Sequence, residues 1–304
     1  MSSLRKLITA VVSVGVVGAL LTGTAVAPAQ AANKKIAFVM GAESDPFFQA
    51  MKVGAEAAAK ANNIDLIWQG DPSEYSPATQ IPVVDQVLAQ KPDALVLIPT
   101  DPTALQASVA KAKAAGIPVI NVDTRVNDLT DVLSFITGDN ADGGAKAADA
   151  LAKAIKYKKG KTYQVVVGLT SATATTNVAR LDGFSKQIAK KYPGIKIVDK
   201  AYSQSQPAKA NTNVSNWLTK YPKLAGIFAI DGTNAAGAAA AIQAKGLKGK
   251  VALVGYDAYK ANVDLIGKGV FTALVAQDPA AEAKLAIEYL VKYFAGQTSG
   301  IKKE

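Results

Sequence analysis

Short apolar runs, rich in Val, Ile and Leu, recur along the chain with longer mixed stretches between them. In the first half they read IAFVM from 36, DLIWQ from 65, ALVLI from 94, PVINV from 118 and VLSFI from 132. Runs that are continuously apolar indicate strands buried on both faces. The stretch after the first run has apolar or small residues at 47, 48, 51, 54, 55 and 58, which is the spacing of an amphipathic helix. Strands that alternate with such helices predict βαβ units in a parallel sheet.

The same alternation starts again in the second half. Its apolar runs are VVVGL from 165, IKIVD from 195, AGIFAI from 225, VALVGY from 251 and TALVAQ from 272. We therefore predict an α/β fold of two similar halves, each built on a parallel sheet. No stretch rich in Gly, Ser or Pro separates the halves, so we expect a short junction near Thr137 to Asn140 that acts as a hinge.

Local signals predict several element boundaries. Ser-Pro at 76 and Asp-Pro at 101 are typical of a helix cap followed by the first helical residue, and Gly116 is typical of a helix end. Pro82 lies inside the helix predicted over 77–90, where its missing N–H should kink or delay the helix. The final GQTSGIKKE, residues 296–304, has too little apolar character for a strand, and we expect a loose tail.

The first 31 residues have the pattern of a secretory signal peptide. Arg5 and Lys6 precede a mostly apolar run from Leu7 to Leu21, and a stretch of small residues ending in AQAA follows. The run is too short to cross a membrane as a helix, which takes about 20 apolar residues. We expect cleavage before Ala32 and export to the periplasm, without a lipid anchor because no cysteine lies near the cleavage site.

Composition removes several classes of function. The chain has no Cys and no His, so it cannot build a disulfide, a thiol nucleophile, an imidazole base or an ordinary zinc site. We expect no cofactor, no metal and no catalytic residue. The net charge is +10, but the lysines are scattered along predicted helices, and after the signal peptide the only arginines are Arg125 and Arg180. We therefore expect no nucleic-acid partner.

Candidate binding residues follow the strands, because ligands of parallel sheets bind beyond the carboxyl ends of the strands. The polar and aromatic residues in those loops are Asp45, Phe47, Phe48, Pro99, Thr100, Asp101, Asp123, Thr124, Arg125, Thr175, Thr176, Asn177, Arg180, Asp231, Asn234, Asp257 and Gln277. Carboxylates, amides and an arginine beside an aromatic face suit a neutral, hydroxyl-rich molecule such as a sugar or a polyol. Alternatively, Phe48 belongs to the core and Phe47 only shields the hinge.

A phosphorylated ligand fits this pattern poorly. The loop after the first strand, MGAESDPFF, contains neither GxGxxG nor GxxxxGK[ST]. Four aspartates, at 45, 123, 231 and 257, would also repel an anion.

Taken in order, several short segments make the chain similar to the periplasmic sugar-binding proteins of the ribose-binding type, which are substrate receptors of ABC importers. The segments are DPFF at 45, IPVINVDT at 117, ITGDN at 136, ARLDGF at 179, SQPAKA at 205, FAIDGTNAAGA at 228, VGYDA at 254 and VAQDP at 275. The resemblance covers essentially all of the chain after the signal peptide. It implies two Rossmann-like lobes with parallel sheets, joined by a hinge, with the ligand cleft between them.

The resemblance also assigns binding positions. They fall on Asp45, Phe47, Phe48, Asp123, Asp231, Asp257 and Gln277. Ribose binders have an arginine directly after the residue that matches Asp123, where this chain has Thr124 followed by Arg125, so we expect a ligand other than ribose. They also have an arginine where this chain has Val178, so we expect Asn177 or Arg180 to supply that contact.

Two further departures concern the ligand and the hinge. Asp231 stands where asparagine is common in the family, and an added acceptor favours a sugar alcohol or a small monosaccharide. The family usually continues past the helix that ends near Phe294 into another strand and crossing, whereas this chain stops at Glu304, so we expect the third hinge strand to be missing or degraded. The resemblance implies an N-terminal lobe at 32–137 plus 278–295, a C-terminal lobe at 138–277 and a tail at 296–304.

We therefore predict the substrate-binding protein of an ABC-type sugar importer, a monomer that delivers a neutral monosaccharide or sugar alcohol to a permease in the inner membrane. Two alternatives stay open. One is an exported carbohydrate-active enzyme that uses two cleft aspartates, although no carboxylate has an evident environment that raises its pKa. The other is a receptor that presents a sugar to a chemoreceptor.

Overall fold

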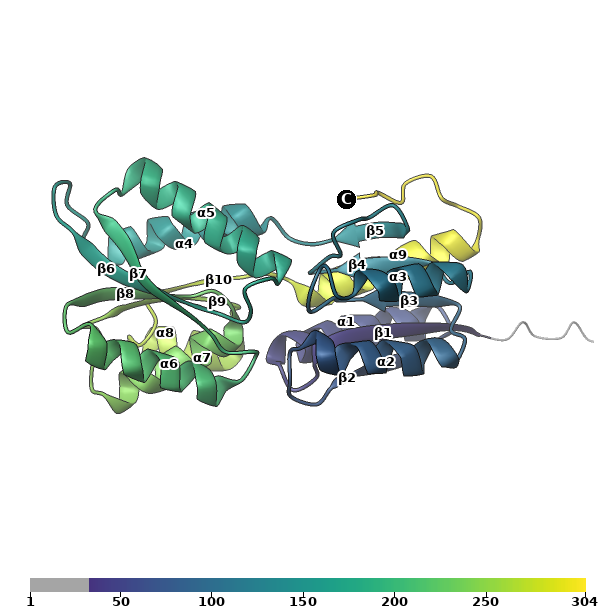
Figure 1. Ribbon diagram of the computed structural model, residues 1–304, viewed down its shortest axis with the longest axis horizontal. Coiled ribbons are helices and arrows are strands. Elements are labelled where there is room, and N and C mark those ends of the chain that lie inside the picture. Colours follow the sequence, from purple (N-terminus) through teal and green to yellow (C-terminus); the bar gives the residue numbers. More distant parts are fainter. Residues whose placement is uncertain (1–32) are drawn as a thin grey trace, which may run out of the picture. The chain divides into compact units, whose positions relative to one another are not determined.

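The computed structural model describes residues 33–304, and the predicted signal peptide lies outside this range. Two five-stranded parallel sheets form the framework, with strand orders β2-β1-β3-β4-β5 and β10-β9-β8-β6-β7 (Figure 1). The strands are β1 (Lys34–Ala42), β2 (Ile64–Asp71), β3 (Ala94–Leu97), β4 (Val119–Val122), β5 (Val132–Ile136), β6 (Tyr163–Leu169), β7 (Ile195–Tyr202), β8 (Leu224–Ala229), β9 (Ala252–Tyr256) and β10 (Ala273–Val275). Each predicted strand is present, and the predicted α/β fold of two lobes is confirmed.

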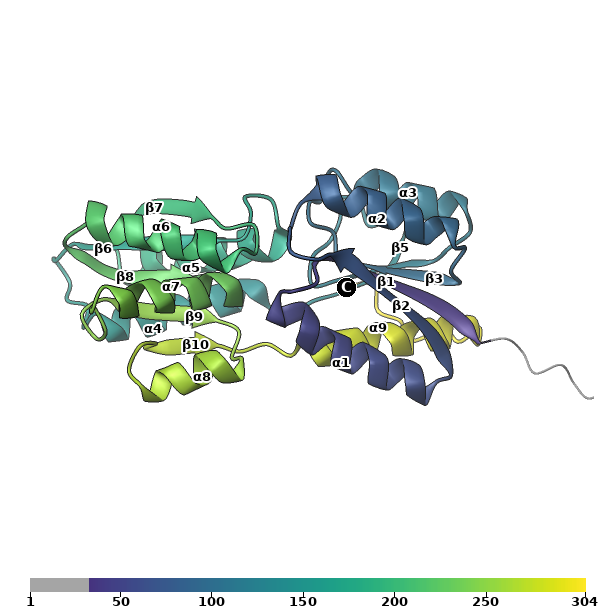
Figure 2. The same ribbon diagram turned by 90° about the horizontal axis from the view of Figure 1, so that it is seen from below.

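Helices cover both faces of each sheet. They are α1 (Pro46–Ala61), α2 (Pro77–Ala89), α3 (Gln106–Ala114), α4 (Asn140–Ala154), α5 (Thr175–Lys191), α6 (Pro207–Lys220), α7 (Gly232–Ala244), α8 (Lys260–Gly267) and α9 (Pro279–Phe294). In the first lobe, α1 and α9 lie on one face of the sheet and α2 and α3 on the other (Figure 2). In the second lobe, α4 and α5 cover one face and α6 and α7 the other.

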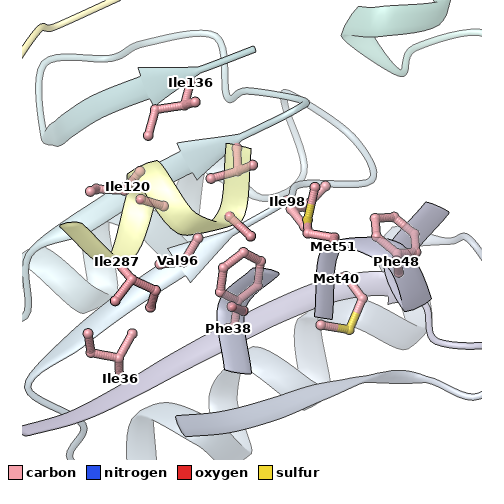
Figure 3. Packing of buried hydrophobic residues seen from close by; sticks show 14 of the residues in the cluster. Ile36, Phe38, Met40, Phe48, Met51, Val96, Ile98, Ile120, Ile136 and Ile287 are labelled. Carbon is pink, nitrogen blue, oxygen red and sulfur yellow. The ribbon is translucent and has the colours of Figure 1, made fainter. Parts of the chain in front are cut away.

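The core of the first lobe explains the continuous apolar runs. Phe38 of β1 is fully buried and stacks on Trp68 of β2, with ring centroids 4.8 Å apart. Met51 of α1 and Ile287 of α9 reach the same cluster from the helix layer (Figure 3). Burying each such side chain stabilises the fold by roughly 1.5–3 kcal/mol. A strand covered on both faces needs apolar residues at every position, which is the pattern seen in the sequence.

The chain passes between the lobes twice. After β5 of the first sheet it enters α4, which packs on α5 in the second lobe, and after β10 of the second sheet it enters α9, which packs on α1 in the first lobe. Glycines allow both helix pairs to approach closely. A Cβ at Gly54 would lie 2.1 Å from the carbonyl oxygen of Ala280, and one at Gly183 would lie 1.9 Å from that of Ala141. The first passage falls at the junction predicted from the sequence.

Three local expectations need correction. The helix expected to begin at Pro102 begins at Gln106, because the Asp101 side chain accepts the N–H groups of Thr103 and Ala104 and closes a turn there instead. Helix α2 begins at Pro77 and runs through Pro82 as one element, so the expected delay is absent, whereas the expected kink stays a prediction.

The expectation of a loose tail is also wrong. The carbonyl oxygen of Lys303 accepts the N–H of Phe135, and that of Lys302 accepts the hydroxyl of Ser134. Ile301 packs against the core of the first lobe. The last residues therefore line the free edge of β5 and satisfy backbone groups that the sheet leaves unpaired. No helix between residues 33 and 304 is long and apolar enough to span a membrane.

Candidate functional site

A cavity of about 390 Å³, counting space open to solvent, lies where the strand ends of the two lobes meet. The lining residues are Asp45, Phe47, Phe48, Tyr75, Asp123, Thr170, Ala174, Thr176, Asn177, Arg180, Ser205, Asp231, Asp257 and Gln277.

The aromatic wall is set by the start of α1. Asp45 caps the helix by accepting the N–H of Phe47 at 3.0 Å, and Pro46 provides a first residue already restricted to a helical φ. Phe47 and Phe48 meet edge to face, with centroids 5.3 Å apart. Both are nearly buried and belong to the core cluster, yet both line the cavity. The two rings therefore belong to the core and also line the cavity, so the two interpretations do not exclude each other.

Two aspartates occupy equivalent places in the two lobes. Asp123 follows β4 and Asp257 follows β9, with φ angles of 59° and 66°. Aspartate is one of the few residues that tolerate this left-handed region. Each donates its N–H at 2.8 Å to the neighbouring strand, to Ile136 and Val275 respectively. This turn places both side chains at the cavity.

The two carboxylates differ in what they bind. Asp257 accepts the N–H of Gly232 at 2.7 Å and Nε2 of Gln277 at 2.6 Å, so the protein already holds it. The Asp123 carboxylate accepts no hydrogen bond from any group within residues 33–304. The residue is also buried, with only 8% of its surface exposed. A buried carboxylate without a donor is costly, and a ligand hydroxyl would supply one.

Arg180 is held rigidly in the second lobe. Its Nε donates to Asn140 at 2.7 Å, one Nη donates to the carbonyl of Ile230 at 3.1 Å and the other to Gln277 at 3.0 Å. The guanidinium also lies 3.8 Å from the ring centroid of Tyr256. These bonds use three of its five N–H donors. Bracing and binding are thus compatible roles for this side chain.

Asp231 has less capacity for a ligand than the sequence suggested. It caps α7 by accepting the N–H of Asn234 at 2.8 Å, and its other oxygen accepts Oγ1 of Thr170 at 2.8 Å and Nδ2 of Asn234 at 2.7 Å. Three protein donors therefore occupy most of the roughly four acceptor sites of this carboxylate. Asp231 has little acceptor capacity left for a ligand, and the preference for a sugar alcohol stays a prediction.

Burial raises the pKa of several cavity carboxyls. Desolvation, with repulsion from Asp231 and Asp257, raises the pKa of Asp45 to about 6. Desolvation raises the pKa of Asp123 to about 7, although the charge of Arg180 opposes the shift. The expectation that no carboxylate has an environment that raises its pKa is therefore wrong. Sequence could not show it, because these aspartates meet only in the tertiary structure.

Most of the predicted binding residues meet in the cavity. Those that line it are Asp45, Phe47, Phe48, Asp123, Thr176, Asn177, Arg180, Asp231, Asp257 and Gln277. Thr124 and Arg125 do not. The Thr124 hydroxyl donates to the carbonyl of Pro99 at 2.7 Å, and the Arg125 guanidinium lies 5.8 Å from the ring centroid of Phe135.

Four lining residues were absent from the sequence-based set: Tyr75, Thr170, Ala174 and Ser205. Thr170 directly follows β6, and Tyr75 lies in the loop after β2. The rule that ligands bind beyond strand ends covers both of these loops, so a search that included them would have found Tyr75 and Thr170.

Two parallel-sheet lobes with a polar cavity at their strand ends define a two-lobed small-molecule-binding protein. A model of the periplasmic binding protein domain matches residues 36–298. The D-ribose/D-allose-binding protein of Pseudomonas aeruginosa is 33% identical over 279 residues, which cover 89% of this chain and 85% of that protein. The chain therefore belongs to the periplasmic binding protein family.

Other similar proteins agree with this assignment. The xylitol-binding protein of Mycolicibacterium smegmatis is 28% identical, over 93% of this chain and 80% of its own length. The crystal structure of an ABC transporter solute-binding protein from Agrobacterium vitis, bound with alpha-D-tagatopyranose, is 33% identical and has a TM-score of 0.82. The match covers 89% of this chain and 92% of that one.

Proposed function

We propose that this protein is the substrate-binding component of an ABC-type importer and captures a neutral monosaccharide or sugar alcohol in the cavity between its lobes. The observation that carries the proposal is the buried Asp123 carboxylate, which faces the same cavity as Phe47 and Arg180 and accepts no hydrogen bond from residues 33–304. A sugar hydroxyl would donate to the carboxylate while a C–H face packs on the aromatic ring.

The charges around the cavity support a neutral ligand. Four aspartates line it against the single cation of Arg180. Burial already holds the pKa of Asp45 and Asp123 above the usual range, which reflects the cost of placing negative charge there. A phosphate or carboxylate ligand would add to that cost.

Contacts from both lobes suggest how a ligand would hold them together. The Thr233 hydroxyl of α7 donates to Asp45, the cap of α1, at 2.9 Å, and the N–H of Arg125 donates to Thr175 at 3.2 Å. A ligand favours this arrangement only if it binds it more tightly than a separated one. We propose lobe boundaries at 32–137 plus 278–295 and at 138–277, with residues 296–304 attached to the first lobe.

The remaining assignments follow from the family. We propose that the mature protein acts in the periplasm as a monomer after removal of residues 1–31, delivers its ligand to a permease and has no catalytic role. The alternative is a glycosidase, because such an enzyme needs one protonated carboxyl and the pKa values of Asp45 and Asp123 are raised. Incubation with glycosides tests this alternative, since turnover would support an enzyme. A chemoreceptor partner is a further possibility that uses the same site.

The direct test is native mass spectrometry of the purified protein, followed by a thermal-shift panel with D-ribose, xylitol and D-allose. We expect a bound mass in the range of a small sugar or polyol, and a rise in Tm with at least one probe. Asp123→Asn should reduce that rise, because the amide is a weaker acceptor than the carboxylate. A bound phosphate ester, or glycoside turnover without stable binding, would refute the proposal.

A further inference from the structure

Tyr75 forms a part of the cavity wall that the charged residues do not provide. It lies in the loop between β2 and α2, is 7% exposed and lines the cavity from the first lobe. Its hydroxyl lies near the Thr124 hydroxyl and the Asp123 carboxylate, at the wall of the cavity. A phenol has one donor and two acceptor sites, so it can bind a ligand hydroxyl beside a protein partner.

The first sheet is shaped to receive this ring. A Cβ at Gly41 of β1 would lie 2.5 Å from Cδ2 of Tyr75 and 2.7 Å from Cγ2 of Thr100. Any larger residue at 41 would therefore displace the ring of Tyr75 or the side chain of Thr100. On the other side of Tyr75, Ser76 caps α2 by accepting the N–H of Ala78, which fixes the end of the loop. Contacts with the protein itself therefore help to set the position of the ring.

The chemistry of Tyr75 complements that of Asp123. Burial first, and then the nearby Asp123 carboxylate, raise the pKa of Tyr75, so the phenol stays protonated. A phenol both donates and accepts, whereas an ionised carboxylate only accepts. One ligand hydroxyl can therefore donate to Asp123 and accept from Tyr75. An ether oxygen or a carbonyl at that place could use only the tyrosine.

On the basis of the proposed function, we propose that Tyr75 is a specificity-determining residue: its ring limits the cavity to ligands of five or fewer carbons, and its hydroxyl binds the ligand hydroxyl that donates to Asp123. The slot at Gly41 and the position of the phenol at the cavity wall beside Asp123 support this role. A six-carbon sugar would have to displace the ring.

The test uses two variants and three probes. Isothermal titration calorimetry with D-ribose, xylitol and D-allose is carried out on the wild type, Tyr75→Phe and Tyr75→Ala. We expect the wild type to bind a five-carbon probe more tightly than D-allose. Tyr75→Phe keeps the ring and should weaken the better five-carbon probe about tenfold, the usual effect of losing one ligand hydrogen bond. Tyr75→Ala should shift the ratio of Kd values at least about tenfold toward D-allose, because the space of the ring becomes available.

Tyr202→Phe is the matched control, since Tyr202 is 40% exposed and lies outside the cavity. This variant should bind each probe with the same Kd as the wild type. The Tm of each ligand-free variant shows whether that variant folds. If Tyr75→Ala does not fold, Tyr75→Phe still tests the role of the hydroxyl. Either of two results would overturn the specificity role and leave the proposed function intact. One is an unchanged ratio of the Kd values for the five-carbon probe and D-allose in both variants, and the other is a wild-type preference for D-allose. Absence of binding to all three probes by the wild type would overturn both.

Discussion

Glu282 offers the sharpest test of the electrostatics at the passage between the lobes. It lies in the first turn of α9, is 9% exposed, and its Oε1 lies 3.8 Å from the position of a Cβ at Gly138 on the first passage. Its Oε2 has no hydrogen-bond partner among residues 33–304. Desolvation, followed by the charge of Asp123, raises the pKa of Glu282 to about 8, against the opposing effect of Arg180.

The raised pKa has a defined effect on stability. The folded state keeps the proton that the unfolded state loses above pH 4.5, so the free energy of unfolding falls as pH rises from 4.5 to about 8. Each pH unit in this window costs about 1.4 kcal/mol. Glutamine at position 282 resembles the protonated acid and does not ionise in the unfolded chain. The advantage of Glu282→Gln over the wild type should therefore grow by about 3 kcal/mol between pH 5 and pH 7.

Urea unfolding followed by circular dichroism at pH 5, 6 and 7 measures this difference. The comparison between variants removes the contribution of Asp45, whose raised pKa acts in the same direction in both proteins. Glu288→Gln is the control, because Glu288 lies on the same helix with 43% of its side chain exposed. A constant difference for Glu282→Gln from pH 5 to pH 7 would show that Glu282 is ionised in the folded protein and would refute the reasoning.

Three further predictions concern the site and the tail. Asp123→Asn should weaken the binding of whichever probe the wild type prefers at least about tenfold in calorimetry, and equal affinity would remove Asp123 from the site. Arg180→Lys loses the fork that holds Gln277, so both ligand affinity and Tm should fall, and a drop in Tm alone would leave only the bracing role. Deleting residues 301–304 removes the hydrogen bond from the N–H of Phe135 to the tail. The free energy of unfolding, measured by urea titration, should fall by about 1–2 kcal/mol. No change would mean that the tail does not stabilise the sheet.

The sequence by itself determined the order of the elements and the class of the fold. Continuous apolar runs at regular spacing predict buried parallel strands because a strand between two helix layers has no polar face. The same reasoning located the passage near Thr137 and most cavity residues, since parallel strands bring their carboxyl ends to one edge. Local capping signals worked where one side chain decides the outcome, as at Ser76, and failed at Asp101, which closes a turn before the helix.

Only the tertiary structure decided how each side chain is used. Thr124 and Arg125 follow a cavity aspartate in sequence but bond and pack elsewhere, because the left-handed turn at Asp123 redirects the chain after it. Asp231 keeps its place but not its free acceptors, since Thr170 and Asn234 occupy them. Hydrogen-bond partners and burial depend on residues far apart in the chain, and one sequence does not reveal which of them meet. The pKa shifts of the cavity carboxyls and the position of Tyr75 follow from these tertiary contacts.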